Sequence, residues 1–307
     1  MFRRIIFWLF IVSIALGSVW LFVLRAPQSE VGNGGVHVVA SIYPLAYIAS
    51  AVGGDLVSVR TLVPSGTEAH DYEPSPRDFV EIGRSDIFFY NGAGFEPWVN
   101  KWQEVKSAGD LRTINVADML GEYGVPLLNR NNVIDPHFWL DSVIFQKEIE
   151  IVRDAIIRAD PEHADIFIEN ATVLTNIIRD TDEQLQKGLA SCALREVIVS
   201  HDAFGYLARR YGISVTSIAG ISPDEEPAPK DLARISAIAR EKGIKYIFSE
   251  TVASPKFSEA IAREIGGQVL VLNPIESLTP SDVQLGEDYV SKMKMNLTNL
   301  QTAMTCQ

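Results

Sequence analysis

The chain is poor in cysteine and holds only Cys192 and Cys306 among its 307 residues. These two form no CxxC pair, so a metal site built from several thiolates is excluded. In an oxidising compartment the pair could instead form one disulfide, and closing so long a loop would contribute about 4–5 kcal/mol in the chain-entropy model. Two free thiols remain an open alternative, because the sequence does not show whether the cysteines meet.

Several catalytic signatures are also missing. The chain has no GxSxG nucleophile elbow, no Walker loop and no HExxH pair, and Gly92-Ala93-Gly94 lacks the later glycine of a dinucleotide site. Ser200-His201-Asp202 contains the residue types of a hydrolytic triad, but sequence neighbours rarely face one another as a triad requires. We therefore expect a protein that is not an enzyme.

Basic residues are scarce relative to acidic ones. Lys and Arg total 27 against 39 Asp and Glu, for a formal net charge of -12. Such a field repels nucleic acid and attracts cations, although it does not locate a site. With 47% hydrophobic and 21% charged residues, the composition is that of a globular protein with a proper core.

One long apolar run opens the chain. Residues 5–24 carry no charge, follow Arg3 and Arg4, and approach the roughly 20 residues that a membrane-spanning helix needs. The basic pair favours a cytoplasmic N-terminus, which places the rest of the chain outside the cytoplasm, in the periplasm or on the outer face of the membrane. No Ala-x-Ala site follows, which favours an uncleaved anchor over a cleaved signal, with both kept open. No cysteine follows either, so lipid attachment there is not expected.

Beyond a flexible tether that ends near residue 35, strand and helix patterns alternate. The expected strands are residues 37–42, 56–63, 86–92, 112–117, 195–200, 213–218, 245–250 and 268–273. Strands that alternate with helices predict parallel sheets covered by helices. Ser75 and Pro76 should begin one helix, and residues 161–189 read as one long helix.

These patterns divide the chain into four parts. We expect an anchor or signal with its tether at 1–35, an α/β lobe at 36–155, a connecting long helix at 156–190, and a second α/β lobe at 191–307. The two lobes should share an architecture, although their sequences show no obvious repeat.

Polar side chains gather where the predicted strands end. His70 and His201 follow strands, His137 precedes a helix, and Glu250 and Glu276 follow strands of the second lobe. Ligands of open α/β sheets bind beyond the carboxyl ends of the strands, so a site here would lie between the lobes.

Three imidazoles and a carboxylate suit a tetrahedral zinc site. The spacing of these residues is too wide to decide by itself between a metal site, ordinary loop histidines and catalytic use. The other two histidines, His37 and His163, are expected to be structural.

Five ordered motifs resemble one family. EAHDYEPSP (68–76), NGAGFEPW (91–98), DPHFWLD (135–141), SHDAFGYLARRYGI (200–213) and LNPIESLT (272–279) are similar to the zinc/manganese solute-binding proteins of bacterial ABC importers. The resemblance implies two α/β lobes joined by a long rigid helix, with the metal between them.

Carried over by position, the resemblance implies His70, His137 and His201 as three ligands. A histidine at position 201 marks zinc-type members, where manganese-type members tend to carry a carboxylate. Many members have Asp where Asn273 stands, so this chain resembles those in which the later Glu276 is the fourth ligand. Glu250 and water are the competing fourth ligands, with Glu250 expected to orient another ligand instead. The family's His-rich loop is absent from residues 121–134.

The function implied is capture of Zn²⁺ outside the cytoplasm, with Mn²⁺ as the alternative metal, and delivery of the metal to a membrane permease with its ATPase. The chain should act as a monomer and approach the membrane through its N-terminal segment. The alternatives are an adhesion or interaction protein with zinc as a structural ion, a manganese-preferring carrier, and a zinc hydrolase.

Overall fold

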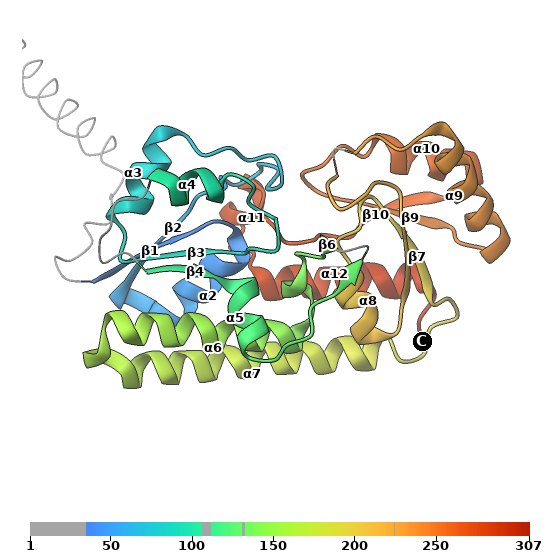
Figure 1. Ribbon diagram of the computed structural model, residues 1–307. Coiled ribbons are helices and arrows are strands. Elements are labelled where there is room, and N and C mark those ends of the chain that lie inside the picture. The colour runs from blue at the N-terminus through green and yellow to red at the C-terminus, as the bar shows by residue number, and fades with distance from the viewer. Residues whose placement is uncertain (1–34, 106–111, 131–132, 224) are drawn as a thin grey trace, which may run out of the picture. The chain divides into compact units, whose positions relative to one another are not determined.

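The computed structural model describes residues 35–105, 112–130, 133–223 and 225–307. Residues Val36–Gln307 form one compact unit, which contains two parallel four-stranded sheets and the helices that cover them (Figure 1). The predicted α/β class with two parallel sheets is confirmed. The expected membrane segment at residues 5–24 lies outside the described residues.

The two sheets have the same topology. The first has the order β2-β1-β3-β4 and the second the order β10-β9-β7-β8. Their strands are β1 Val36–Ala40, β2 Val57–Thr61, β3 Ile87–Tyr90, β4 Arg112–Asn115, β7 Glu196–Val199, β8 Ser214–Ser217, β9 Tyr246–Ser249 and β10 Gln268–Val271. All eight predicted strands are present within a few residues of their expected bounds. In each sheet the strand order reverses beside the first strand, between β1 and β3 and between β7 and β9.

Helices cover both faces of each sheet. They are α2 Tyr43–Gly53, α3 Pro76–Arg84, α4 Val99–Val105, α5 Val116–Glu122, α6 Ser142–Ala159, α7 Ala164–Gly188, α8 Gly205–Tyr211, α9 Pro229–Lys242, α10 Lys256–Ile265, α11 Pro280–Gln284 and α12 Tyr289–Met304. We call the first sheet with α2–α5 the first lobe, and the second sheet with α8–α10 the second lobe. The sequence did not predict α4, α5, α11 or the hairpin of β5 Asn129–Arg130 and β6 Val133–Ile134, because such short elements carry too little periodicity.

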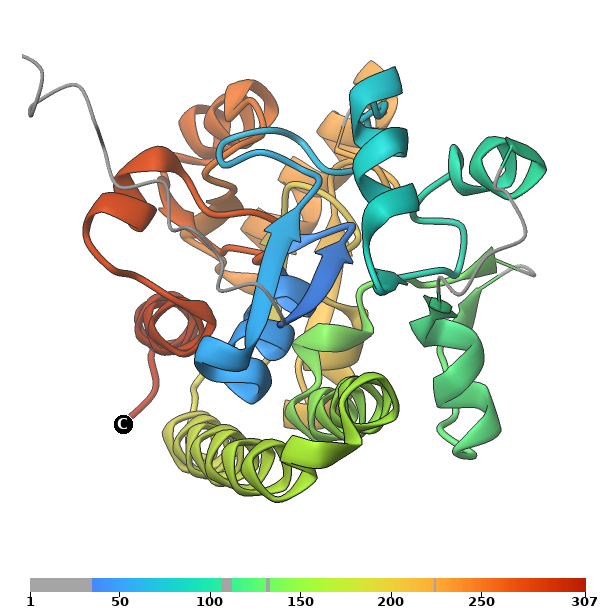
Figure 2. The same cartoon turned by 90° about the vertical axis from the view of Figure 1, so that its left-hand side faces the viewer.

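The long helix α7 runs under both lobes, beside α6 (Figures 1 and 2). Near its start, Asn170 Nδ2 donates to the carbonyl of Val52 in α2, and near its end Asp182 forms an ion pair with Arg210 of α8. The helix begins at Ala164 after a 3₁₀ turn at Pro161–His163, and residues 156–159 belong to α6. The division into lobes at 155 and 190 stays a prediction.

The core is continuous between the lobes. The largest cluster of buried apolar side chains includes Phe89 of the first sheet, Val199 of the second, and residues of α6, α7 and α12. A second cluster lies under α3 and α4, and a third packs Ile198 and Ile247 against α9 and α10. Successive side chains of a strand point to opposite faces of the sheet, so both faces of each sheet are buried.

A disulfide joins the end of α12 to the segment after α7. Cys192 and Cys306 are bonded, with Cα atoms 3.8 Å apart, and their backbones form an isolated antiparallel bridge. The alternative of two free thiols is therefore wrong for this structure. The sequence could not decide this, because 114 residues separate the two cysteines.

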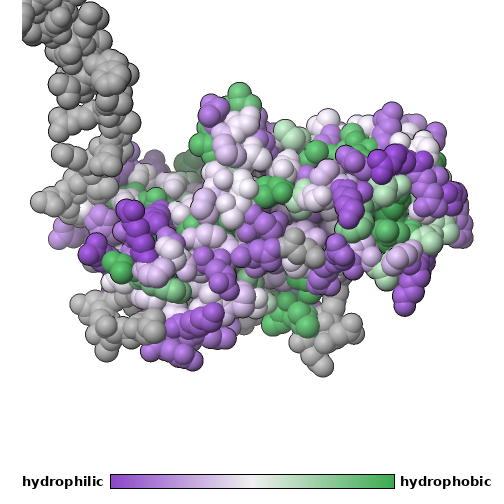
Figure 3. Space-filling model, turned by 90° about the horizontal axis from the view of Figure 1, so that it is seen from above, coloured by the Kyte–Doolittle hydropathy of each residue, from purple (hydrophilic) through white to green (hydrophobic). Residues whose placement is uncertain are grey.

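The face seen from above is mostly polar. Seen from above, hydrophilic side chains dominate the face in Figure 3, and apolar side chains form separate small patches between them. Among the described helices, none combines the length and apolar character needed to cross a membrane.

Candidate metal centre

His70 lies in the loop between β2 and α3. Ser75 caps α3, as the sequence predicted. Asp78 completes a capping box with it, and this fixes the end of the loop. The His70 ring lies against Phe95, with ring centroids 4.4 Å apart, and its backbone N–H donates to Glu68 Oε1 at 3.2 Å. The loop is therefore held from both sides of the histidine.

His137 lies just before α6 and is fully buried. Its Nδ1 is 2.9 Å from Asp135 Oδ1, which also accepts from the His137 backbone N–H at 3.0 Å. The carboxylate keeps the proton on Nδ1 and leaves the lone pair of Nε2 facing the cleft. The side chain of Asn91 in the first lobe donates to the Pro136 carbonyl at 2.9 Å and fixes the backbone beside the histidine.

His201 and Glu250 follow β7 and β9, the two strands between which the order of the second sheet reverses. This is where open α/β sheets bind ligands. Glu250 Oε1 lies 2.5 Å from His201 Nδ1 and also accepts from the Ser200 hydroxyl. Glu250 therefore orients the imidazole, and Ser200 is not arranged as a nucleophile beside a free base.

Glu276 follows the second sheet in sequence, but its backbone is attached to the first lobe. Its carbonyl accepts from the Tyr43 backbone N–H at 3.2 Å, and the next residue, Ser277, donates its hydroxyl to the Thr67 carbonyl at 3.0 Å. His201 is thus the one member of the group whose backbone belongs to the second lobe.

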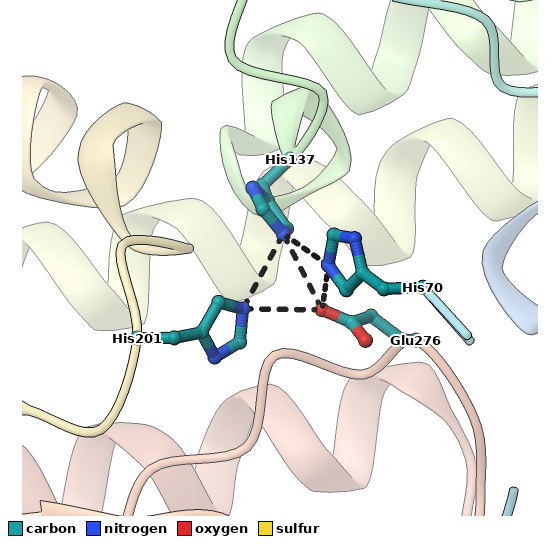
Figure 4. Close-up of side chains that lie close together, drawn as sticks. All are labelled: His70, His137, His201 and Glu276. Carbon is teal, nitrogen blue, oxygen red and sulfur yellow. Dashed lines mark hydrogen bonds and ion pairs between the residues drawn. The ribbon is translucent and has the colours of Figure 1, made fainter. Parts of the chain in front are cut away.

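Four side chains converge on one point between the lobes: His70, His137, His201 and Glu276 (Figure 4). Their ligand atoms all lie within 4.8 Å of one another. Glu276 Oε1 is 3.5, 3.4 and 3.5 Å from the Nε2 atoms of His70, His137 and His201. His137 Nε2 is 3.2 Å from His70 Nε2 and 3.4 Å from His201 Nε2.

These spacings match a small four-coordinate cation. Ligands about 2.0–2.1 Å from a tetrahedral zinc ion are separated by about 3.3–3.4 Å. Glu276 Oε1 is buried and has no hydrogen-bond partner among the described residues, and two of the facing imidazoles already use Nδ1 for a carboxylate. Four acceptor atoms at this distance repel one another unless protons or a cation lie between them.

The close approach of these side chains shifts their pKa values. Burial by itself raises the pKa of the Glu276 carboxyl, but the histidines that face it hold that pKa well below its usual range. Burial lowers the pKa of His137 and His201, yet their carboxylate partners outweigh it, and the pKa of each is raised. Without a metal, these shifts favour protonated imidazoles beside an ionised carboxylate.

A pocket lies beside the centre, on the side of Glu276. Its lining includes Glu68 of the first lobe, Glu250 and Thr251 of the second, and Asn273 and Glu276 of the segment that joins them. Burial and the nearby Glu276 raise the pKa of Glu68 to about 8. The lining is thus rich in carboxyl groups, which suits the approach of a cation.

The structure brings together the four residues that the family resemblance implied as ligands, and it leaves His37 and His163 outside the group. Sequence reasoning missed Asp135, whose place two residues before His137 was the available signal. It also missed Asn91 and the attachment of Glu276 to the first lobe, which depend on contacts distant in sequence.

Comparison with known proteins gives the family. The model of the family described as zinc-uptake complex component A, periplasmic, matches residues 38–303. The chain belongs to this zinc-uptake family. The high-affinity zinc uptake system protein ZnuA of Bacillus subtilis is 31% identical over 284 residues, which is 88% of each chain.

Other proteins similar to this chain are longer or carry a further description. The zinc-binding lipoprotein AdcA of Streptococcus pneumoniae is 32% identical, and the chain covers 60% of its length. The Zn(II)-bound ZnuA-like domain of AdcA superimposes with a TM-score of 0.77, at 33% identity over 88% of this chain and 99% of that one. The laminin-binding protein Lmb of Streptococcus agalactiae is described as bifunctional, with adhesin and metal-transporting activity. It superimposes with a TM-score of 0.79, at 28% identity over 88% of this chain and 99% of that one.

Proposed function

We propose that this chain is a Zn²⁺-binding protein that works outside the cytoplasm and hands its metal to a membrane transporter. His70, His137, His201 and Glu276 supply the four ligand atoms. The single observation that carries the proposal is the spacing of these atoms, 3.2–3.5 Å for the pairs that include His137 Nε2 or Glu276 Oε1. That spacing is the edge of a zinc tetrahedron.

The donor set favours zinc over manganese. Three neutral imidazoles and one carboxylate oxygen are typical of zinc, whereas manganese is better served by oxygen donors and more of them. Asp135 and Glu250 each accept a hydrogen bond from the Nδ1–H of a ligand histidine, which raises the basicity of the ligating Nε2. Four protein ligands leave no position for a reactive water, so the site binds its metal without chemistry.

Delivery follows from the family and from the expected N-terminal segment. In this proposal the chain acts as a monomer, is held at the membrane through residues 5–24, and passes Zn²⁺ to a permease driven by an ATPase. The acidic pocket that reaches Glu276 offers the metal a route into and out of the centre. Capture by the protein and transport by the permease are then separate steps.

Binding is tested on the purified chain after a chelator has removed its metal. Calorimetry with a bound-metal assay should show one zinc per chain with sub-micromolar affinity, and zinc at 100 times Kd should stabilise the fold by about 2.7 kcal/mol. The variant with His70, His137 and His201 all changed to Ala should lose this binding. A matched double variant, His37→Ala with His163→Ala, should keep it. Equal binding by the triple variant would overturn the proposal.

Delivery is tested in cells that lack the chain and grow in zinc-limited medium. The wild-type chain should restore growth and zinc content, and the triple variant should not, although both reach the cell surface. The similarity to Lmb favours a second function, adhesion to a host protein. Two results together would favour adhesion over transport. Cells with the wild-type chain and cells with the triple variant would adhere equally well, and zinc uptake would depend on neither chain.

A further inference from the structure

The turn that carries Glu276 has an unusual backbone. Ile275 has a φ of 62° and is fully buried. Of the described residues other than glycine, only Ala93, Ile275 and Thr305 have a positive φ, and Ile275 is the buried one. A β-branched residue is strained in the left-handed region and persists there only when its surroundings hold it. The neighbour of the fourth ligand is therefore held in place by specific contacts.

The side chain of Asn273 supplies the central contact. Its Oδ1 accepts from the Ile275 backbone N–H at 2.7 Å, which closes a turn of the kind that Asn and Asp form with the residue two positions on. Its Nδ2 donates to Thr251 Oγ1 at 3.2 Å, next to Glu250. The amide thus joins the turn to the end of β9, the strand that also places the partner of His201.

The backbone around Asn273 is fixed as well. Its N–H donates to Asn296 Oδ1 at 2.8 Å and its carbonyl accepts from Asn296 Nδ2 at 2.7 Å. The Pro274 carbonyl accepts from Trp139 Nε1 at 2.7 Å. With the Glu276 carbonyl bound to Tyr43, both sides of Ile275 are held, and the side chain of Asn273 controls the turn between them.

We propose that Asn273 is a positioning residue of the metal centre, whose amide holds the left-handed turn at Ile275 and so directs the Glu276 carboxylate at the three imidazoles. This inference rests on the proposed zinc binding and adds a residue to it. Asn273 lines the same pocket as Glu68, Glu250 and Glu276. The Asn273 amide accepts from Ile275 and donates to Thr251 without adding a further carboxyl group to that lining.

A double-mutant cycle on zinc affinity tests the proposal. Asn273→Ala should lower the affinity by about 10–100-fold, the usual effect of removing a residue that orients a ligand. A residue that acts only through Glu276 has nothing left to position once that carboxylate is gone. In the Glu276→Ala background, the same Asn273→Ala change should therefore leave the affinity unchanged. Equal losses in both backgrounds would assign Asn273 a general structural role and overturn the proposal.

Two further measurements separate positioning from stability. With Co²⁺ as the probe, Asn273→Ala should change the ligand-field absorption in the same way as Glu276→Ala. Asn273→Asp keeps the acceptor for the Ile275 N–H, so it should bind zinc more tightly than Asn273→Ala. A wild-type Co²⁺ spectrum in Asn273→Ala, or equal weakness of the two variants, would contradict the proposal.

The matched control is Asn299→Ala, which removes a 2.8 Å hydrogen bond to the Val271 carbonyl at the end of β10 without touching the turn. It should lower stability and leave zinc affinity and the Co²⁺ spectrum unchanged. If Asn273→Ala does not fold, Thr251→Val takes its place in the cycle, because it removes the acceptor of the Asn273 Nδ2. A wild-type chain that binds no zinc would refute the proposed function. If the wild-type chain binds zinc but the effects of Asn273→Ala and Glu276→Ala are additive, only the role of Asn273 is refuted.

Discussion

The carbonyl of Glu276 accepts a hydrogen bond from the backbone N–H of Tyr43, 3.2 Å away. This bond joins a segment that follows the second sheet to the first helix of the first lobe. Glu276 and His70 are attached to the first lobe, and the backbone beside His137 is held by Asn91 of that lobe and by Tyr206 of α8. His201 is the ligand that the second lobe brings to the centre, so a metal bound to all four joins the two lobes.

We expect His201→Ala to separate metal binding from this joining of the lobes. Zinc should still bind the three remaining ligands, at least about 10-fold more weakly. Hydrogen exchange in the wild-type chain should slow on zinc addition in both sheets, because the ion links them. In His201→Ala at saturating zinc, slowing should be confined to the first lobe and the segment around Glu276. The control is His163→Ala, whose imidazole contacts Asp160 away from the centre. Equal protection of both sheets in His201→Ala would contradict this expectation.

Zinc binding should release protons near neutral pH. The pKa values of His137 and His201 are raised by their carboxylate partners against the opposing effect of burial, so both imidazoles hold protons that zinc must displace. Calorimetry in buffers of different ionisation enthalpy should therefore show proton release, and the zinc affinity should fall as the pH is lowered. Binding heats that do not depend on the buffer would rule out this displacement.

The same shifts predict opposite pH trends for the loaded and the metal-free protein. A histidine whose pKa is raised on folding stabilises the fold fully below its unfolded pKa of about 6.5, and this stabilisation is lost as the pH rises through the folded value. The Tm of the metal-free chain should fall as the pH rises through this range. Zinc binds more tightly over the same range, so the Tm of the zinc-loaded chain should fall less. The Tm difference between the two forms should widen with pH, and a constant difference would show that these histidines do not carry the linkage.

Glu148 of α6 should weaken the fold at neutral pH. Its side chain is fully buried, and neither carboxylate oxygen has a hydrogen-bond partner among the described residues. Burial, and then the charge of Asp141, raise its pKa well above the usual range. A carboxyl whose pKa is raised on folding favours the folded state most below its unfolded pKa. The stability of the fold then falls as the pH rises from the unfolded pKa to the folded pKa.

Glu148→Gln should therefore raise the stability at pH 7 by about 1–3 kcal/mol, with a gain that shrinks toward pH 4. Denaturant unfolding at several pH values measures this, and Glu169→Gln on the exposed face of α7 is the control. A gain that does not vary with pH would mean that ionisation of Glu148 is not the cause.

Loss of the disulfide should cost stability without weakening zinc binding. Cys192 and Cys306 close a loop with a sequence separation of 114, for which chain entropy predicts a loss of about 4–5 kcal/mol as an upper value. The Cys192→Ser and Cys306→Ser double variant should unfold at lower denaturant. Its zinc affinity should stay near that of the wild type, because the bridge lies at the end of α12, away from the four ligands. A large fall in affinity would show that the bridge also shapes the centre.

The sequence by itself determined the fold class and all of the longer elements. Alternating apolar strands and amphipathic helices are local patterns, so all eight strands, the long helix and the Ser75 cap were predictable from short stretches of chain. His70, His201 and Glu250 could be placed at strand ends for the same reason, because parallel strands present their carboxyl ends at one edge. The motifs around His70, His137, His201 and Glu276 then indicated the family.

Only the tertiary structure decided how these pieces meet. The sequence left the disulfide open, and it gave no sign that Glu276 is held by Tyr43, that Asp135 orients His137, or that Asn273 holds the turn at Ile275. Each of these depends on backbone and side-chain atoms that folding brings within hydrogen-bond distance. The spacing of the ligand atoms likewise depends on the tertiary structure. The distances of 3.2–3.5 Å join atoms carried by separate loops, and the packing of the whole unit sets them.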